Sequence, residues 1–98
     1  MLPLPETVTL REAQDTLRML SQALQREAAD TLTVDASPLR EFDSAALAVL
    51  LECRRLAQAF GKRFAVHGAP AKLTGLAKLY GIDELLALNT PQAQPQAA

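Results

Sequence analysis

The sequence contains very little cysteine and histidine, two residues on which many catalytic and metal sites depend. Its 98 residues include one cysteine, Cys53, and one histidine, His67. A single cysteine excludes a disulfide within the chain, and one thiol with one imidazole falls short of the usual zinc ligand sets. A nucleophile, a base and an orienting group cannot be assembled from these two residues. We therefore expect no metal, no cofactor and no enzymatic activity.

Clustered glycines, a large net charge and long apolar runs are also absent from the sequence. The four glycines are isolated from one another, so neither a Walker sequence nor a dinucleotide fingerprint exists. A formal net charge of −1 argues against a general nucleic-acid binder, which usually displays a basic surface. No window approaches the roughly 18 apolar residues of a membrane span, and residues 1–6 do not resemble a signal peptide. We expect a cytoplasmic chain without a membrane span.

The apolar pattern of the chain predicts strands that alternate with helices. Strands are expected where apolar and β-branched residues alternate, over 7–10, 31–35 and 64–67. Helices are expected from apolar spacing over about 13–24, 44–60 and 70–80, and a glycine follows each of the last two. This order predicts an α/β fold with a mostly parallel or mixed sheet and crossover helices. One domain is expected over residues 1–88, followed by a disordered tail over residues 89–98.

The start of the second predicted helix is the most informative segment for function. Asp43 and Ser44 stand where unpaired backbone N–H groups and the positive end of the helix dipole converge. Such a place can bind an anion, carry a phosphate or contact a partner, but Asp and Ser are also favoured helix caps. Ala45, Ala46 and Leu47 then open a helix that is apolar on every side. Either a neighbouring helix covers the sides that the sheet leaves open, or the first two turns expose an apolar patch for a partner.

Three segments of the chain resemble the STAS family, which includes domains of sulfate transporters and anti-sigma-factor antagonists. They are Val34–Ser37, Phe42–Leu47 and Leu73–Tyr80. The resemblance extends over roughly residues 7–86, and Leu76–Tyr80 is most similar to the STAS subunits of Mla-type ABC transporters. It implies a small STAS-like fold and a non-catalytic accessory subunit. Such a subunit binds the cytoplasmic ATPase of the transporter and, through it, a membrane permease.

The resemblance also implies which residues contact the partner. By motif position, Ser44 is the hydroxyl residue at the contact, with Asp43 beside it and Ala45, Ala46 and Leu47 as its apolar part. The implied role is phospholipid trafficking that maintains outer-membrane lipid asymmetry, at a location peripheral to the inner membrane. The alternative within the family is an anti-sigma-factor antagonist that is regulated by phosphorylation of Ser44. A homodimer of the isolated chain is a further possibility.

Two features depart from the pattern of the family. Ala46 stands where many STAS domains, including the anti-sigma-factor antagonists, have a glycine. The region before the first predicted helix holds one predicted strand, where many relatives have two. We therefore expect the edge of the sheet to be formed differently, or to be left for a partner.

Overall fold

The computed structural model describes residues 2–86, within which the chain forms five strands and three helices. In chain order they are β1 (Leu2–Pro3), β2 (Thr7–Val8), α1 (Ala13–Arg26), β3 (Thr31–Asp35), β4 (Glu41–Phe42), α2 (Ser44–Ala59), β5 (Arg63–His67) and α3 (Ala71–Leu79). Strands β1, β3 and β5 form one parallel sheet in the order β1-β3-β5, and β2 and β4 form a separate parallel pair. The predicted α/β fold with a mostly parallel sheet is confirmed. The predicted disordered tail, residues 89–98, lies outside the described residues.

The edge of the main sheet corrects the sequence-based prediction. Two strands precede α1 rather than one, because Leu2 and Pro3 pair with Val34 and Asp35 of β3. The pairing continues beyond the strand, where the Leu4 amide donates to the Asp35 carbonyl at 2.9 Å. Proline normally argues against a strand, but an edge position tolerates it. The edge of the sheet is therefore formed by the chain itself.

The second correction concerns the strand predicted over residues 7–10. This strand ends at Val8 and pairs with β4 instead of joining the main sheet. Strand β4 lies between the predicted strand 31–35 and the predicted helix 44–60, where we predicted no strand. The pairing is reinforced where the amides of Arg40 and Glu41 both donate to the Glu6 carbonyl, at 2.8 and 2.9 Å. The small sheet thereby joins the segment before α1 to the segment before α2. Both helices start from the same corner of the molecule.

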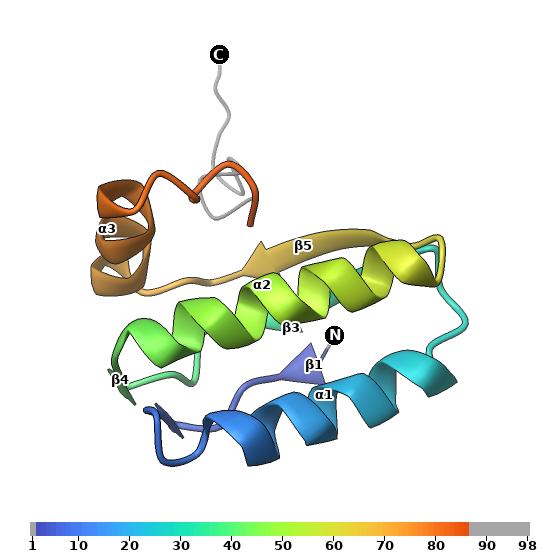
Figure 1. The fold of residues 1–98 in the computed structure, drawn as a ribbon, viewed down its shortest axis with the longest axis horizontal. Helices are drawn as coiled ribbons and strands as arrows, with labels where there is room; N and C mark the ends of the chain where they lie inside the picture. The colour runs from blue at the N-terminus through green and yellow to red at the C-terminus, as the bar shows by residue number, and fades with distance from the viewer. Residues whose placement is uncertain (1, 87–98) are drawn as a thin grey trace.

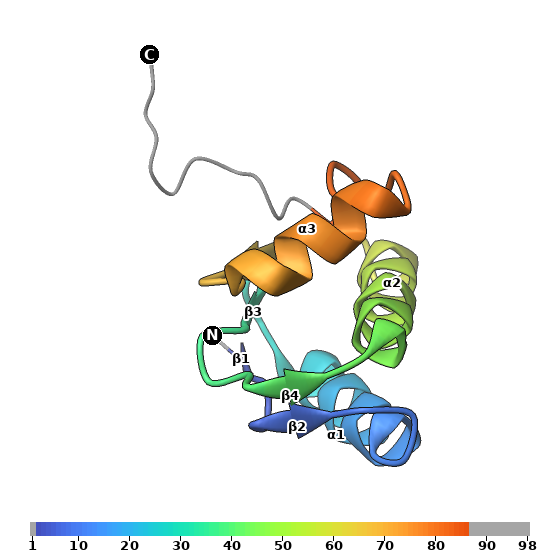
Figure 2. The ribbon, with the colours of Figure 1, turned by 90° about the vertical axis from the view of Figure 1, so that its left-hand side faces the viewer.

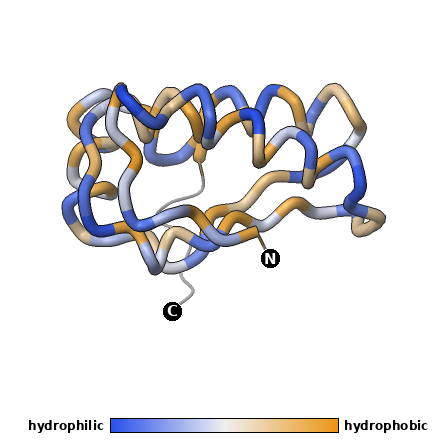
Figure 3. Tube along the Cα trace, turned by 90° about the horizontal axis from the view of Figure 1, so that it is seen from below, coloured by the Kyte–Doolittle hydropathy of each residue, from blue (hydrophilic) through white to orange (hydrophobic). Residues whose placement is uncertain are grey.

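The helices are arranged around the sheet so that α2 occupies the centre of the molecule. Helices α1 and α2 lie side by side on one face of the sheet, and α3 lies beyond the β5 edge, next to α2 (Figure 1, Figure 2). Figure 3 shows hydrophilic and hydrophobic residues interspersed along much of the trace. Within residues 2–86, no helix is both long enough and apolar enough to cross a membrane.

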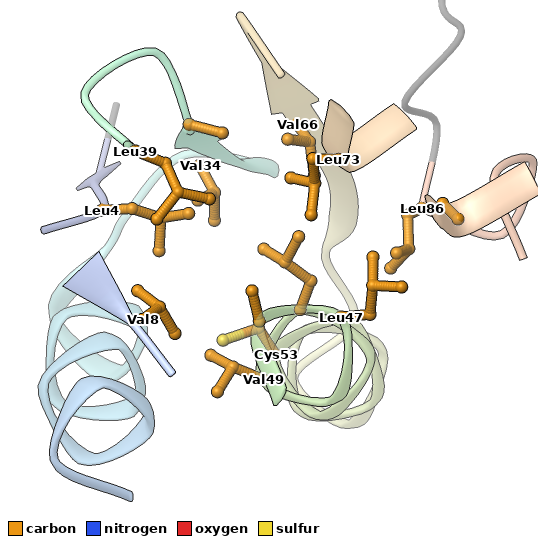
Figure 4. Packing of buried hydrophobic residues seen from close by; sticks show 14 of the residues in the cluster. Leu4, Val8, Val34, Leu39, Leu47, Val49, Cys53, Val66, Leu73 and Leu86 are labelled. Carbon is orange, nitrogen blue, oxygen red and sulfur yellow. The ribbon is translucent and has the colours of Figure 1, made fainter. Parts of the chain in front are cut away.

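The hydrophobic core is built around α2. Six residues of this helix are buried: Ala46, Leu47, Val49, Leu50, Cys53 and Ala57. Figure 4 shows Val8 on the side of the core that faces Cys53 and Val49, with Leu73 and Leu86 on the side of Leu47. Cys53 has an exposed fraction of 1%. Burial raises the pKa of the Cys53 thiol to about 12, so the thiol stays neutral and serves as an apolar side chain.

A glycine follows each of the helices α2 and α3, as predicted. Gly61 has a φ of 72°, its amide donates to the Gln58 carbonyl, and the Lys62 amide donates to the Ala57 carbonyl. Gly81 has the same φ, and Ile82 likewise bonds back to Ala77 at 2.9 Å. These paired bonds define Schellman motifs, in which glycine avoids the steric cost of a left-handed backbone. The second motif turns the chain so that Ile82 faces back toward α2.

Gly68 couples the loops that follow β3 and β5. Its φ is 70°, and a Cβ atom at this position would lie 2.9 Å from the Cβ of Ser37. We expect Gly68→Ala to lower the free energy of unfolding by about 1–2 kcal/mol through backbone strain, and further through this contact. Gly61→Ala carries the same strain without a neighbour within 4 Å, and Gly75→Ala, inside α3, should be neutral or stabilising. Urea unfolding measures all three, and equal losses for Gly61→Ala and Gly68→Ala would contradict the proposed contact.

Candidate partner-binding site

Asp43 joins two elements at the corner where α1 and α2 begin. As the N-cap of α2, its Oδ1 accepts from the Ala45 amide at 2.8 Å. Its Oδ2 accepts from the Leu10 amide at 3.2 Å, in the turn between β2 and α1. Both carboxylate oxygens are therefore used within the chain. The capping role that the sequence predicts for Asp43 is confirmed, and the bond to Leu10 is an addition that the sequence did not reveal.

Ser44 is the first residue of α2 and is exposed to solvent. Within residues 2–86, no hydrogen bond of its hydroxyl to the rest of the chain is found. The hydroxyl therefore stays available to an external group, while the backbone of Ser44 is fixed by the helix. Ala45, the next predicted site residue, is partly buried beside it.

Ala46 and Leu47 are placed differently from the other three predicted site residues. Their exposed fractions are 1% and 2%, because the core of the domain covers them. The sequence left open whether neighbouring elements or a partner cover the apolar start of α2. Neighbouring elements of the domain cover most of its first two turns. Leu47 reaches the surface only as part of a groove wall. An acidic residue at Leu47 is consequently expected to unfold the domain rather than to report on a partner.

A groove runs between the first half of α2 and the end of α3. It has a volume of about 400 Å³ and is lined by Ser44, Leu47, Ala48, Leu51, Tyr80 and Ile82. We call it the α2/α3 groove. It brings together the two segments that the sequence singled out, the start of the second helix and the residues up to Tyr80. Tyr80 follows the end of α3 and is 58% exposed at the groove.

The surface around the α2/α3 groove is apolar at its centre and polar at its margin. Leu79 is 78% exposed and precedes Tyr80, and Ala48 is exposed on the outer side of α2. One turn beyond Ala48, Glu52 and Arg55 form an ion pair and hydrogen bonds. A smaller groove on the other side of α2, the α1/α2 groove, is lined by Ala13, Gln14, Leu17, Ala48 and Val49. Ala48 thus forms the ridge that separates the two grooves.

His67 and Cys53 both lie outside the linings of the two grooves. Within residues 2–86, no group of three or more His, Cys, Asp and Glu side chains is placed to hold a metal ion. His67 is exposed at the end of β5, where its carbonyl accepts from the Ala36 amide at 2.8 Å. Cys53 is buried, away from the grooves. The site consists of an available hydroxyl, an apolar groove and a polar margin.

A comparison of the sequence with protein families finds a match to one of them. A family model described as "Mlab, STAS domain" matches residues 1–87. The chain belongs to this STAS family. Among curated proteins, the comparison found none that matches the chain. The matched range includes the residues of both walls of the α2/α3 groove.

Asp43 and Ser44 are expected to contribute very differently to the stability of the STAS domain. Asp43→Ala removes the cap of α2 and the acceptor of the Leu10 amide, and should cost about 1–2 kcal/mol of unfolding free energy. Ser44→Ala removes a hydroxyl that holds nothing within the described residues, and should change stability by less than about 0.5 kcal/mol. Chemical denaturation measures both variants. A large loss for Ser44→Ala would show that its hydroxyl has a structural role.

Asp35, at the carboxyl end of β3, makes the stability of the fold vary with pH in the acidic range. Hydrogen bonds from the Ser37 side chain and then the Ser37 amide, whose nitrogen lies 3.1 Å from Oδ1, lower the pKa of Asp35 below its usual 3.8. Because the pKa of Asp35 is lower in the folded state, its ionised carboxylate stabilises the fold at pH values above the ordinary pKa of an aspartate. This contribution is lost as the pH falls below about 4. We expect Asp35→Asn to lose less stability than the wild type in that window. Identical acid titrations of stability would contradict this assignment.

Proposed function

We propose that the chain is the non-catalytic STAS subunit of an Mla-type ABC transporter. In this role it binds the cytoplasmic ATPase subunit and, through it, a membrane permease that moves phospholipids and maintains outer-membrane lipid asymmetry. The match to the Mlab STAS family over residues 1–87 is the observation that carries the proposal. The scarcity of catalytic residues supports a binding role. We further propose that residues 1–88 act as one domain, located in the cytoplasm and peripheral to the inner membrane.

The α2/α3 groove is the surface that we propose for the ATPase. Its apolar residues, among them Leu51, Tyr80 and Ile82, would supply the buried centre of the contact. Ser44 at one end and the Glu52–Arg55 pair at the margin would supply polar contacts. An apolar centre within a polar rim is the usual anatomy of protein interfaces, and an exposed tyrosine is among the residues enriched there. In this proposal Ser44 donates or accepts a hydrogen bond, while Asp43 holds the helix start in place.

A second function within the same family uses the same hydroxyl. An anti-sigma-factor antagonist would be switched by phosphorylation of Ser44, and the exposure of this residue at the start of a helix favours access by a kinase. A phosphate there would add a charge of about −1.5 to −2 beside an apolar groove, which opposes binding of an apolar partner surface. Phosphorylation therefore provides the observation that separates the two functions.

Affinity purification of the tagged chain from detergent-solubilised native cells tests the proposed function. We expect mass spectrometry to identify an ABC ATPase and its permease among the recovered proteins. Recovery of a serine kinase or a sigma-factor regulator instead, with phosphate on Ser44, would contradict the transporter function and support an anti-sigma-factor antagonist. A recovered second copy of the chain alone would indicate a homodimer that uses the same apolar surface.

A negative charge within the α2/α3 groove should weaken ATPase binding while the fold persists. Ala48→Glu places a carboxylate on an exposed helical ridge, where glutamate has a good helix propensity, and should weaken binding at least about tenfold. Ser44→Glu should act in the same way, since an acidic residue is favourable at a helix start. Gln58→Glu, exposed near the far end of α2, is the matched control. Calorimetric titration against the purified ATPase measures the effect, and unchanged binding by Ala48→Glu would remove the groove from the interface.

A further inference from the structure

Leu10 is a large apolar side chain held on the surface next to the proposed site. It is 80% exposed, the highest value among the large hydrophobic residues of the described chain. A single exposed leucine is common and by itself needs no explanation. The position of Leu10 is unusual, because its amide donates to the carboxylate of Asp43, the residue before Ser44. Asp43 therefore connects the two: it accepts a hydrogen bond from the Leu10 amide and directly precedes Ser44, the proposed contact residue.

The turn that carries Leu10 is held by further hydrogen bonds. The hydroxyl and the amide of Thr9 donate to the Glu12 carboxylate at 2.5 and 2.9 Å, and the Glu12 amide donates to the Thr9 carbonyl at 3.0 Å. The bonds from Thr9 lower the pKa of Glu12, so its carboxylate remains charged and able to accept them. Residues 9–12 thus form a closed turn with Leu10 at its tip. Less conformational entropy is lost on binding when the backbone that carries the buried side chain is already fixed in place.

The α1/α2 groove lies between the turn that carries Leu10 and the α2/α3 groove. Three residues after Leu10, Ala13 begins the wall of the α1/α2 groove, which also contains Leu17 and Val49. This groove shares Ala48 with the α2/α3 groove. Because Ala48 is a small residue, a partner that covers the α2/α3 groove can extend past it into the α1/α2 groove. The turn that carries Leu10 leads into α1, which forms the far wall of that groove.

We propose that Leu10 is a second anchor for the same ATPase subunit, on the opposite side of α2 from Tyr80. This proposal rests on the proposed function and commits to an apolar pocket of the ATPase as the occupant of this surface. Asp43 is then a positioning residue, because it sets the place of Leu10 and of the α2 start with its two oxygens. The interface straddles the first half of α2 instead of lying on one side of it.

Calorimetric titration of the full chain with the purified ATPase subunit tests this second anchor. We expect Leu10→Ser to weaken binding about tenfold and Leu10→Met to bind nearly as the wild type, because the loss is of apolar contact. Both variants should keep the wild-type stability, since the side chain is largely exposed. Met19→Ser is the matched control: Met19 is also exposed on α1, two residues along from Leu17 and hence on another side of the helix. It should bind normally.

A double-mutant cycle tests whether Asp43 acts through Leu10. Asp43→Asn keeps a favoured helix cap but has a single acceptor oxygen, so the Leu10 amide loses its partner. We expect Asp43→Asn to weaken binding several-fold in the wild type and much less in the Leu10→Ser background. Equal effects in both backgrounds would overturn the positioning role.

The outcomes separate the second anchor from the proposed function. If Leu10→Ser binds like the wild type while Ala48→Glu does not bind, the second anchor is wrong and the ATPase contact stands. If the wild type does not bind the ATPase at all, the proposed function fails and the second anchor fails with it. If Leu10→Ser and Met19→Ser weaken binding equally, the loss is not specific to the Leu10 surface and the anchor is overturned.

Discussion

The burial of α2 is the constraint on which the rest of the structure depends. This helix supplies more buried residues than α1 and α3 together, and it is apolar on every side over its first two turns. A sheet covers only one side of a helix, so the remaining apolar surface requires α1 on one flank and α3 on the other. The two grooves lie where these flanking helices diverge from α2. The outer ridge, with Ser44 and Ala48, is what the domain itself leaves uncovered.

Much of the fold could be predicted from the sequence, because its signals are local. The alternation of Leu32 and Val34 indicates a strand, and a glycine after each of the last two helices indicates where it ends. The strands β1 and β4 could not be found in this way. Each has two residues, which is too short for a periodic pattern, and β1 contains a proline. Their existence depends on backbone pairing with β3 and β2, distant in the sequence, and such pairing leaves no trace in side-chain chemistry.

The candidate site could be predicted in part for the same physical reason. Asp43 and Ser44 are identified by local preferences of a helix start, and the structure places both at the surface. Leu47 could not be assigned to core or partner, since a helix that is apolar all round carries no information on which side is covered. Leu10 was predicted to lie within a strand, where its side chain would alternate inward or outward; the turn that exposes it depends on the carboxylates of Glu12 and Asp43. Only the tertiary fold brings the second carboxylate to it.

The use of both Asp43 oxygens within the chain affects how a charge at Ser44 would act. A phosphate or carboxylate at Ser44 meets the first amides of α2 and the positive end of its dipole, so the fold tolerates it. The same charge would also face Asp43 and the apolar wall formed by Leu51 and Ile82. A protein surface that fills the groove would have to desolvate that charge without a compensating partner, which costs far more than the contact of one hydroxyl contributes. In the proposed interface, Asp43 therefore contributes both to stability and to the position of Leu10. A charge on Ser44 would weaken binding without unfolding the domain.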